Sequence, residues 1–432
     1  GPKGTLLSTG FAVLYLSQAN TSLAISKLRF DGNWNSRPHD LWNFADYVSQ
    51  TCENHTTWQI VDADLPVQVL VESPLLLLAC DGSFRFNDQQ IKNLRDYIRA
   101  GGLILTNADQ PSSRVSTSLR KLVSDLFDKK SLKPLDRQHE LYRLHQHLVK
   151  SVPMQVMDNG IRPLMIHFGK DIGSDLQSND HSADGFAALS NIYLYSIGMT
   201  PTHGRLENNY VTQHNRNPQR EITVARIRHD GTYDPEPLAL PQLKAICANE
   251  HDIDLQFDTV APGSLSHEKL AFMTVTGDAQ LSDEEATAIR RWLDAGGTLW
   301  LDAAGGSNQA VKNLHAIVQQ MGKLPSGQTP PPLSQRDPII TGRDLRDGYD
   351  NSQVRYRLYA LHRTGPLNRP RLLVLSRQER PAIILSEEDL TCGLAGLKHW
   401  GIWGYEPKSA RQLVLNGILS VLQQQSNSPP ES

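Results

Sequence analysis

The chain has few cysteines, no long apolar run and no large excess of either charge. Its 432 residues include four cysteines, Cys52, Cys80, Cys247 and Cys392, with no CxxC pair among them. These are too few for a disulfide framework and too scattered for a zinc site, although one disulfide within each half stays open. The formal net charge of −3 gives no broad electrostatic attraction to nucleic acid or to an acidic membrane.

No segment approaches the ~18–20 consecutive apolar residues that a membrane-spanning helix needs. Near the N-terminus, Lys3 and the apolar residues 5–16 resemble a secretory signal with cleavage near Ala19 or Ala24. The same residues also fit a β-strand, because residues 11–12 align with residues 210–211. The leading Gly1-Pro2 resembles the scar of a protease cleavage, in which case the native start is absent.

What the chain does contain is a repeat of itself. Asp31-Gly32-Asn33-Trp34 recurs 199 residues later as Asp230-Gly231-Thr232-Tyr233, and residues 88–108 recur without a gap as residues 283–303. Later matches follow in the same order, at growing offsets, and they pair Pro134-Leu135 with Pro332-Leu333, Asp171-Ile172 with Asp389-Leu390, and Asn191 with Asn416. We expect a tandem duplication, with copy one in residues 1–205, copy two in residues 206–432, and residues 200–220 as the linker. The growing offset predicts an insertion near residues 343–376.

Each copy alternates short apolar runs with amphipathic segments, which is typical of βαβ units around a mostly parallel sheet. A helix opens at Asn87 with Gln90 three residues on, which resembles a capping box, and its counterpart opens at Ser282 with Glu285, the better box. Each of these helices ends at a Gly-Gly pair that permits a left-handed turn. Residues 141–149 also fit a helix, which would point His145 and His147 apart. The sequence therefore predicts two tandem doubly wound three-layer α/β/α domains with mostly parallel sheets.

In an open parallel sheet, ligands bind beyond the carboxyl ends of the strands, so residues that follow each expected strand are candidate site residues. They are acidic or amide side chains with one aromatic ring in each copy: Asp31, Trp34, Asp81, Asn107, Asp109 and Asp171 in copy one, and Asp230, Tyr233, Asp278, Asp302 and Asp389 in copy two. Their oxygens could coordinate a divalent cation or hold a polar ligand such as a sugar or an amine. Alternatively, Asp and Asn at strand ends serve as turn formers and helix caps, and the rings cover the core as lids.

Residue types that carry nucleophilic catalysis are missing where they would be expected. Neither turn after the strands at residues 103–106 and 298–301 places Ser or Cys at its apex. No glycine-rich loop suited to a phosphate appears. We expect Cys80 to be buried and inert, which leaves Cys392 as the one thiol worth testing.

Four segments together resemble a known family. Residues 28–34 (Leu-Arg-Phe-Asp-Gly-Asn-Trp), 281–285 (Leu-Ser-Asp-Glu-Glu), 293–297 (Leu-Asp-Ala-Gly-Gly) and 389–393 (Asp-Leu-Thr-Cys-Gly) resemble the bacterial domain of unknown function 4159. That family is similar in architecture to class I glutamine amidotransferases, so the resemblance implies a flavodoxin-like sandwich in each half. An implied fold does not imply a function.

The same resemblance argues against the amidotransferase reaction. Where such an enzyme carries its nucleophilic cysteine, this chain has Asn107-Ala108 and Asp302-Ala303. Members of the family often look exported, which favours an exported or periplasmic location slightly over a cytoplasmic one, and the compartment otherwise stays open.

We therefore expect a non-catalytic binding or scaffold protein, a pseudoenzyme that presents the carboxyl edge of each sheet to a protein partner or a small polar ligand, and not to nucleic acid. The alternative is a metal-dependent hydrolase, in which the Asp-lined edge holds a divalent cation that activates water. A redox or acyl role for Cys392 is a third hypothesis. Residues 206–432 are expected to fold alone.

Overall fold

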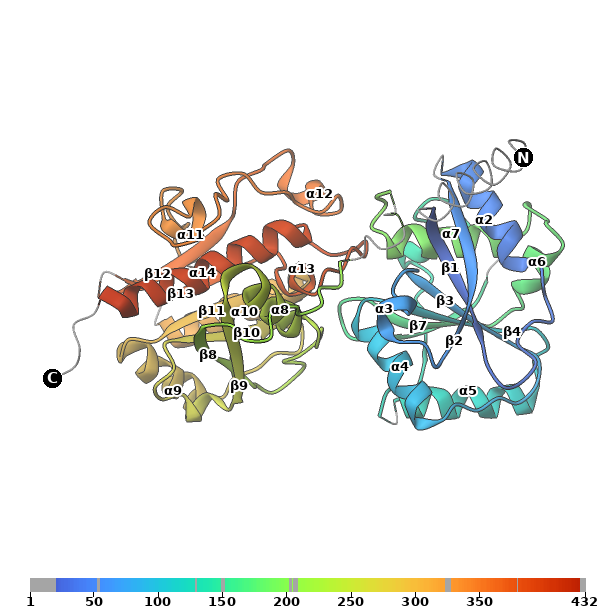
Figure 1. The fold of residues 1–432 in the computed structure, drawn as a ribbon, viewed down its shortest axis with the longest axis horizontal. Helices are drawn as coiled ribbons and strands as arrows, with labels where there is room; N and C mark the ends of the chain where they lie inside the picture. The colour runs from blue at the N-terminus through green and yellow to red at the C-terminus, as the bar shows by residue number, and fades with distance from the viewer. Residues whose placement is uncertain are drawn as a thin grey trace, which may run out of the picture. The chain divides into compact units, whose positions relative to one another are not determined.

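The computed structural model describes residues 21–52, 55–128, 130–148, 152–201, 204, 209–322, 328–378 and 380–427. The signal or strand expected within residues 1–20 lies outside these residues. The chain divides into two compact units, Gly1–Asn208 and Asn209–Ser432 (Figure 1). No described helix combines the length and the apolar character needed to cross a membrane.

The first unit is built on a seven-stranded sheet in the order β2-β1-β3-β4-β7-β6-β5, in which β6 is antiparallel to both of its neighbours and the other strands share one direction. Helices α4 and α5 cover one face of this sheet, and α2, α6 and α7 cover the other (Figure 1). The strands are β1 (Ser22–Arg29), β2 (Thr56–Asp62), β3 (Leu75–Cys80), β4 (Leu103–Ala108), β5 (Lys133–Pro134), β6 (Met154–Asp158) and β7 (Pro163–Phe168). The helices are α2 (Asp40–Thr51), α3 (Val67–Leu70), α4 (Asp88–Arg99), α5 (Ser113–Leu126), η1 (Glu140–Tyr142), α6 (Gly173–Gln177) and α7 (Asp184–Ser196).

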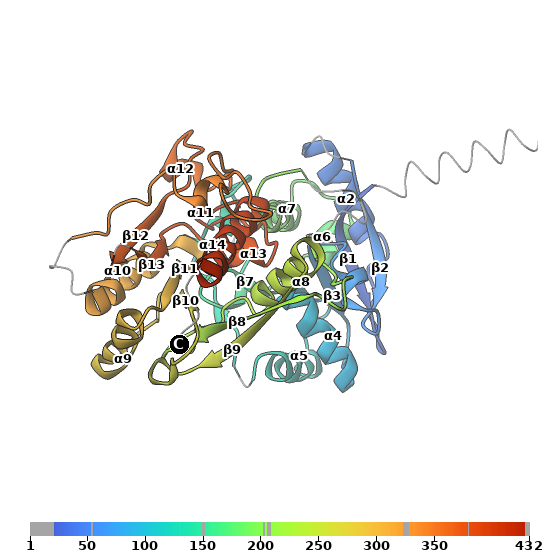
Figure 2. The ribbon, with the colours of Figure 1, turned by 60° about the vertical axis from the view of Figure 1, so that its left-hand side comes forward.

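The second unit has a six-stranded sheet in the order β12-β13-β11-β10-β8-β9, with only β12 antiparallel. Helices α9 and α10 lie on one face, and α8, α13 and α14 lie on the other (Figure 2). The strands are β8 (Arg220–Ile227), β9 (Ile253–Val260), β10 (Leu270–Val275), β11 (Thr298–Ala303), β12 (Leu372–Arg377) and β13 (Arg380–Ser386). The helices are α8 (Ala239–His251), η2 (Pro262–Ser264), α9 (Asp283–Asp294), η3 (Ala304–Gly306), α10 (Asn308–Gly322), α11 (Pro338–Thr341), α12 (Leu361–Thr364), α13 (Thr391–Leu394) and α14 (Pro407–Asn427).

The two sheets repeat the same topology. Strands β2-β1-β3-β4-β7-β6 of the first unit correspond one by one to β9-β8-β10-β11-β13-β12 of the second. The pairing of Pro134 with Gln155 in the first unit is repeated as a bridge between Pro332 and Leu373. Two mostly parallel mixed sheets with helices on both faces confirm the predicted fold class.

The best-matched part of the repeat shows why these residues are helical. Both capping boxes form, at Asn87 and at Ser282. Of each Gly-Gly pair, the first glycine takes positive φ, 99° at Gly101 and 112° at Gly296. The second glycine, at 102 and at 297, is needed for packing, because a Cβ there would lie 2.2 Å from the ring of Tyr97 or Trp292.

The helix predicted for residues 141–149 is wrong. Within the described residues 141–148, only the 3-10 turn η1 is helical, because the buried side chain of Asn191 on α7 takes over the backbone groups of the segment. Its Oδ1 accepts the N–H groups of His145 and Gln146, at 3.0 and 2.9 Å. Its Nδ2 donates to the carbonyls of Leu141 and Gln146. A buried amide that satisfies four backbone groups replaces the hydrogen bonds of a helix.

In the second unit, Asn416 on α14 makes hydrogen bonds equivalent to those of Asn191. The backbone segments that the two asparagines bind can therefore be matched, and the extra residues of copy two follow the matched segment. Its Oδ1 accepts the N–H of Tyr349, and its Nδ2 donates to the carbonyls of Ile339 and Tyr349. In the first unit the chain reaches β6 eight residues after Gln146, whereas in the second it travels from Tyr349 through α12 to β12 at Leu372. The insertion therefore falls in residues 350–371, within the predicted region.

Candidate functional site

The structure brings three predicted residues of copy one together at the carboxyl edge of the sheet. Asn107 lies at the end of β4, and its Nδ2 donates to Asp109 Oδ1 at 2.7 Å and to Asp171 Oδ1 at 2.8 Å. Its Oδ1 accepts the N–H of Ile172 at 3.0 Å. Gly173 has little room for a side chain, because a Cβ would lie 3.1 Å from Asn107 Nδ2. The cluster is thus organised by one amide group.

The remaining carboxylate oxygens of this cluster are occupied by the loop that follows β1. Ser36 Oγ donates to Asp109 Oδ2, and Arg37 donates to Asp171 Oδ2 at 2.9 Å. Since each oxygen already accepts a protein donor, the rim of copy one is closed from within its own chain.

Sequence reasoning missed a buried ion pair beneath this rim. Lys27 on β1 is fully buried, and its Nζ donates to both oxygens of Asp40, at 2.9 and 2.8 Å, and to the carbonyl of Arg37 at 2.7 Å. Burial raises the pKa of Asp40, and the nearby Lys27 ammonium opposes that rise. The available signal was a lysine between apolar and small residues in a strand that is buried over almost its whole length. A lysine in such a place is rarely buried unless it is paired.

Asp31, Trp34 and Asp81 do not join the Asn107 cluster. Asp31 is exposed, and Trp34 packs against the hydrophobic core, which agrees with the lid interpretation. Asp81 Oδ2 accepts the amide of Asn33 at 3.1 Å, and the N–H of Asp81 donates to the carbonyl of Asn33. Asp81 therefore anchors the loop after β1.

In copy two, Asp278 plays the same anchoring role, because it accepts the N–H and the hydroxyl of Thr232. Asp230 is exposed and forms a backbone bridge with Gln280. The ring of Tyr233 lies under the guanidinium of Arg226, 5.1 Å from its centroid.

Asp302 and Asp389 form the centre of the edge in copy two, and both are buried. Asp302 accepts the N–H groups of Leu390 and Thr391, at 2.9 and 2.8 Å. Asp389 accepts the N–H of Gly305 at 2.8 Å and that of Cys392 at 3.2 and 3.1 Å from its two oxygens. Each carboxylate therefore fixes a loop that follows another strand.

These two acids do not both ionise easily. Burial, with the charge of Asp389 adding to it, raises the pKa of Asp302 to about 7. Burial also raises the pKa of Asp389, while the cationic Arg357 opposes the change. The pair therefore retains a proton close to neutral pH.

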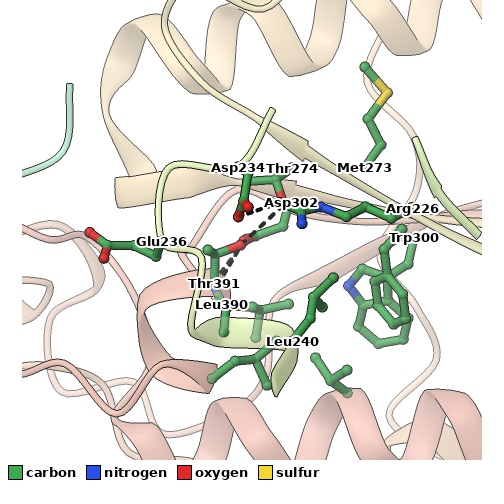
Figure 3. Close-up of a pocket in the computed structure, with 14 residues that line it drawn as sticks. Arg226, Asp234, Glu236, Leu240, Met273, Thr274, Trp300, Asp302, Leu390 and Thr391 are labelled. Carbon is green, nitrogen blue, oxygen red and sulfur yellow. Dashed lines mark hydrogen bonds and ion pairs between the residues drawn. The ribbon is translucent and has the colours of Figure 1, made fainter. Parts of the chain in front are cut away.

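A small cavity of about 30 Å³ opens beside Asp302 (Figure 3). At its polar side, Arg226 forms an ion pair with Asp234, and Glu236 points away from both (Figure 3). Its floor is the fully buried Trp300, whose Nε1 has no hydrogen-bond partner in the part of the chain that the structure describes. The other lining residues are Ala239, Leu240, Phe272, Met273, Thr274, Leu390, Thr391, Leu394 and Val414. This volume suffices for a water molecule or one small polar group.

None of these lining positions except Asp302 was predicted from the sequence. Arg226 and Trp300 lie within strands, where apolar patterning points to core and not to site. Arg226 corresponds to Lys27 in the repeat, and Trp300 corresponds to Leu105. A comparison of the two copies at matched positions would have identified both as substitutions that change the chemistry of the edge.

The cysteines and the metal hypothesis find little support in this geometry. All four cysteines are free. Cys392 is fully buried, and burial together with the nearby Asp389 raises the pKa of its thiol well above the usual range. Burial likewise raises the pKa of Cys80 to about 12. Among the residues described, no three His, Cys, Asp or Glu side chains converge in a way that could hold a metal ion.

Comparison with known proteins identifies a family without a reaction. The domain of unknown function DUF4159 matches residues 22–191 and again residues 223–421. No curated protein matches the chain.

Two solved structures show weak similarity to the chain. A protein described as a phosphosugar isomerase from Silicibacter pomeroyi is 11% identical over 67% of this chain and 77% of that one, with a TM-score of 0.16. Tagatose-6-phosphate ketose/aldose isomerase from Escherichia coli is 12% identical over 75% of this chain and 90% of that one, with a TM-score of 0.18. Scores this low carry no argument about function.

Proposed function

The chain belongs to the DUF4159 family, in two tandem copies, and we propose that it is a non-catalytic binding protein whose second copy holds a small polar ligand at the carboxyl edge of its sheet. This proposal rests on the hydrogen bonds that the carboxylates of Asp302 and Asp389 accept. All four of their carboxylate oxygens accept backbone N–H groups, so the acids hold loops in place and are not presented to a metal ion or a substrate.

The cavity beside them supplies what a binding site needs. Trp300 Nε1 is an unsatisfied buried donor, which favours a ligand or a water that accepts a hydrogen bond. Leu240 and Leu394 give the cavity apolar walls, and Arg226 with Asp234 provides a polar side. The cavity has room for one hydroxyl or carbonyl group of such a ligand, and the rest of the molecule would lie outside it.

We also infer that each copy descends from a flavodoxin-like sandwich of the class I glutamine amidotransferase type that has lost its nucleophile. The parallel order β2-β1-β3-β4-β7 supports this inference, because flavodoxin-like sheets have their first five strands in the order 2-1-3-4-5. Asn107 and Asp302 stand where the nucleophile would be sought, and both are engaged with backbone N–H groups.

The binding proposal is tested by thermal shift with panels of sugars, polyols and primary amines. A ligand at 100 times its Kd stabilises the protein by about 2.7 kcal/mol. We expect that shift to be lost in Trp300→Phe, which removes the donor and keeps most of the ring, and to be retained in the matched copy-one variant Leu105→Met. No shift with any panel member would contradict the proposal.

The alternative, a metal-dependent hydrolase, is tested in the same assay with Mn²⁺, Zn²⁺ and Ca²⁺. A cation-induced shift that is present in the wild type and absent from Asp302→Asn would favour it. Asp31→Ala with Asp81→Ala is the matched control, because these two residues lie outside both clusters.

A further inference from the structure

The insertion of copy two has an unusual composition. Residues 350–371 contain five arginines, a single Asp at position 350 and no Glu or Lys, in a chain whose net charge is −3. Copy one has no corresponding segment, because its chain passes almost directly from Gln146 to β6. The charge of this segment therefore belongs to copy two alone.

The insertion meets the loop that follows α13 in a cluster of rings, which we call the aromatic patch: Tyr359, His362, Arg363, Trp400 and Trp403. The ring centroid of Tyr359 lies 4.4 Å from that of Trp403 and 5.0 Å from that of Trp400. His362 packs edge-on against Trp400 at 6.0 Å, and the guanidinium of Arg363 lies 4.3 Å from the centre of Trp403.

Exposed leucines flank this patch. Leu358, Leu361 and Leu367 are 42%, 40% and 51% exposed, and they are half of the large apolar side chains that are exposed in the described part of the chain. Single exposed apolar residues need no explanation, but three within ten residues of the chain, next to rings and arginines in the sequence, are of the kind found at interaction sites.

The patch is fixed to the carboxyl edge of the sheet. Arg363 donates to the carbonyl of Gly306 at 3.1 Å and to Asn308 Oδ1 at 2.8 Å. The N–H of Trp403 donates to the carbonyl of Gly305 at 3.0 Å. Gly306 has positive φ, and a Cβ there would lie 2.1 Å from the carbonyl oxygen of Trp403, so only glycine allows this approach. A pre-ordered surface loses less entropy when it binds a partner.

The positive charge of the insertion is only partly neutralised. Arg371 pairs with Glu387 and Glu388, and Arg357 is buried near Asp389. By contrast, no carboxylate in the described ranges forms an ion pair with Arg355, Arg363 or Arg369, and Arg355 and Arg369 are exposed. Aromatic residues and arginine are enriched at protein interfaces, whereas Lys, Glu and Asp are depleted there, which is the composition of this insertion.

We propose that the aromatic patch of copy two is the docking surface for an acidic segment of a partner protein that also carries apolar side chains. The apolar side chains pack on the rings of Tyr359 and Trp400 and on the exposed leucines. The carboxylates pair with Arg355 and Arg369. This surface is distinct from the cavity beside Asp302, so the docking proposal does not depend on the small-ligand proposal.

The test begins with selection from a random peptide library on the immobilised full chain. We expect enrichment of sequences that combine Asp or Glu with Leu, Phe or Trp. The best peptide, fluorescently labelled, is then titrated by anisotropy. Arg355→Glu with Arg369→Glu should weaken its Kd at least about 10-fold, as should Leu361→Ser with Trp400→Ala. The affinity should also fall as salt is added.

Matched controls use apolar residues exposed elsewhere. Trp42 and Ile60 in copy one are 59% and 43% exposed, and Trp42→Ala with Ile60→Ser should leave the Kd unchanged. The proposal is overturned if selection yields no acidic and apolar consensus, or if the peptide binds the patch variants as tightly as the wild type. It is also overturned if anionic phospholipid vesicles or single-stranded DNA bind the patch more tightly than the peptide does, because the patch would then serve a different class of partner.

Discussion

The two copies share a fold, but one matched position of their first strand holds side chains that make different contacts in the two copies. In copy one this position holds Lys27, buried and bonded to Asp40. In copy two it holds Arg226, which lines a cavity and pairs with Asp234 at the edge. The ammonium of Lys27 is fully enclosed, whereas the guanidinium of Arg226 is paired with Asp234 and borders the cavity beside Trp300.

This difference indicates how the two copies of a duplicated domain can diverge, with one copy keeping a structural role and the other a binding role. Copy one also turns Ser36 and Arg37 inward onto its acidic cluster, so its rim is saturated. In copy two, backbone N–H groups occupy the oxygens of Asp302 and Asp389 instead. Copy two alone has the arginine-rich insertion. The features that both copies retain, such as the capping boxes and the buried Asn191 and Asn416, are those that hold the fold.

The largest expected effect is the loss of the buried ion pair in copy one. Lys27→Met leaves Asp40 buried without its cation and should cost about 3–5 kcal/mol in free energy of unfolding. Arg226→Met should cost about 1 kcal/mol or less, because the pair with Asp234 is partly solvated. Hydrogen exchange in denaturant resolves the two units through their peptides. Equal losses of stability in Lys27→Met and Arg226→Met would contradict the contrast between the two copies. As a control, Lys27→Met combined with Asp40→Leu should recover most of the stability lost in copy one.

The next effect should be the same in both copies. Asn191→Ala and Asn416→Ala each leave several buried backbone groups without partners, and each should destabilise its own unit by about 3 kcal/mol. The same exchange measurement checks this expectation. Exposed Asn35→Ala is the control and should change stability by at most about 0.5 kcal/mol. A loss confined to one unit would show that the two asparagines are not equivalent.

A pH-dependent effect, smaller for each pH unit than the losses above, should arise from Asp302 in copy two. The unfolded chain ionises Asp302 near its ordinary pKa, whereas folded copy two keeps the proton up to about pH 7. The folded state therefore binds the extra proton between about pH 4 and 7, and stability should fall as pH rises through that window, by at most about 1.4 kcal/mol per pH unit. Exchange measured across this range should show the slope flattened in Asp302→Asn. An unchanged slope in that variant would assign the effect to other groups.

The smallest effect is a difference in thiol accessibility. Cys52 in copy one is only partly buried, while Cys80, Cys247 and Cys392 are buried. A thiol reagent should label Cys52 alone in the native protein and all four cysteines after denaturation, as read by mass spectrometry. Rapid native labelling of Cys392 would revive a redox or acyl role for copy two.

Prediction from sequence succeeded where a residue pattern acts locally. Capping boxes and Gly-Gly pairs determine where helices begin and end through contacts within a few residues, so both long helices of the repeat were predicted correctly. The helix expected at residues 141–149 failed because a side chain from α7, far along the chain, binds that backbone.

For the candidate site, taking residues that follow the expected strands selected Asn107, Asp109 and Asp171, which meet at the edge of the first sheet. The same rule selected Asp302 and Asp389, which meet at the edge of the second. It could not separate these residues from Asp81 and Asp278, which anchor loops, since both groups follow strands in the same way.

The sequence by itself determined that one domain was duplicated, that each copy is an α/β sandwich, and which strand ends carry carboxylates, because periodicity and repetition are properties of the chain. Only the tertiary structure decided which carboxylates face protein donors, that Lys27 is buried against Asp40 while Arg226 lines a cavity, and that Tyr359 and His362 pack against Trp400. Those outcomes depend on side chains far apart in sequence competing for the same hydrogen bonds and the same small volume, and no local pattern records that competition.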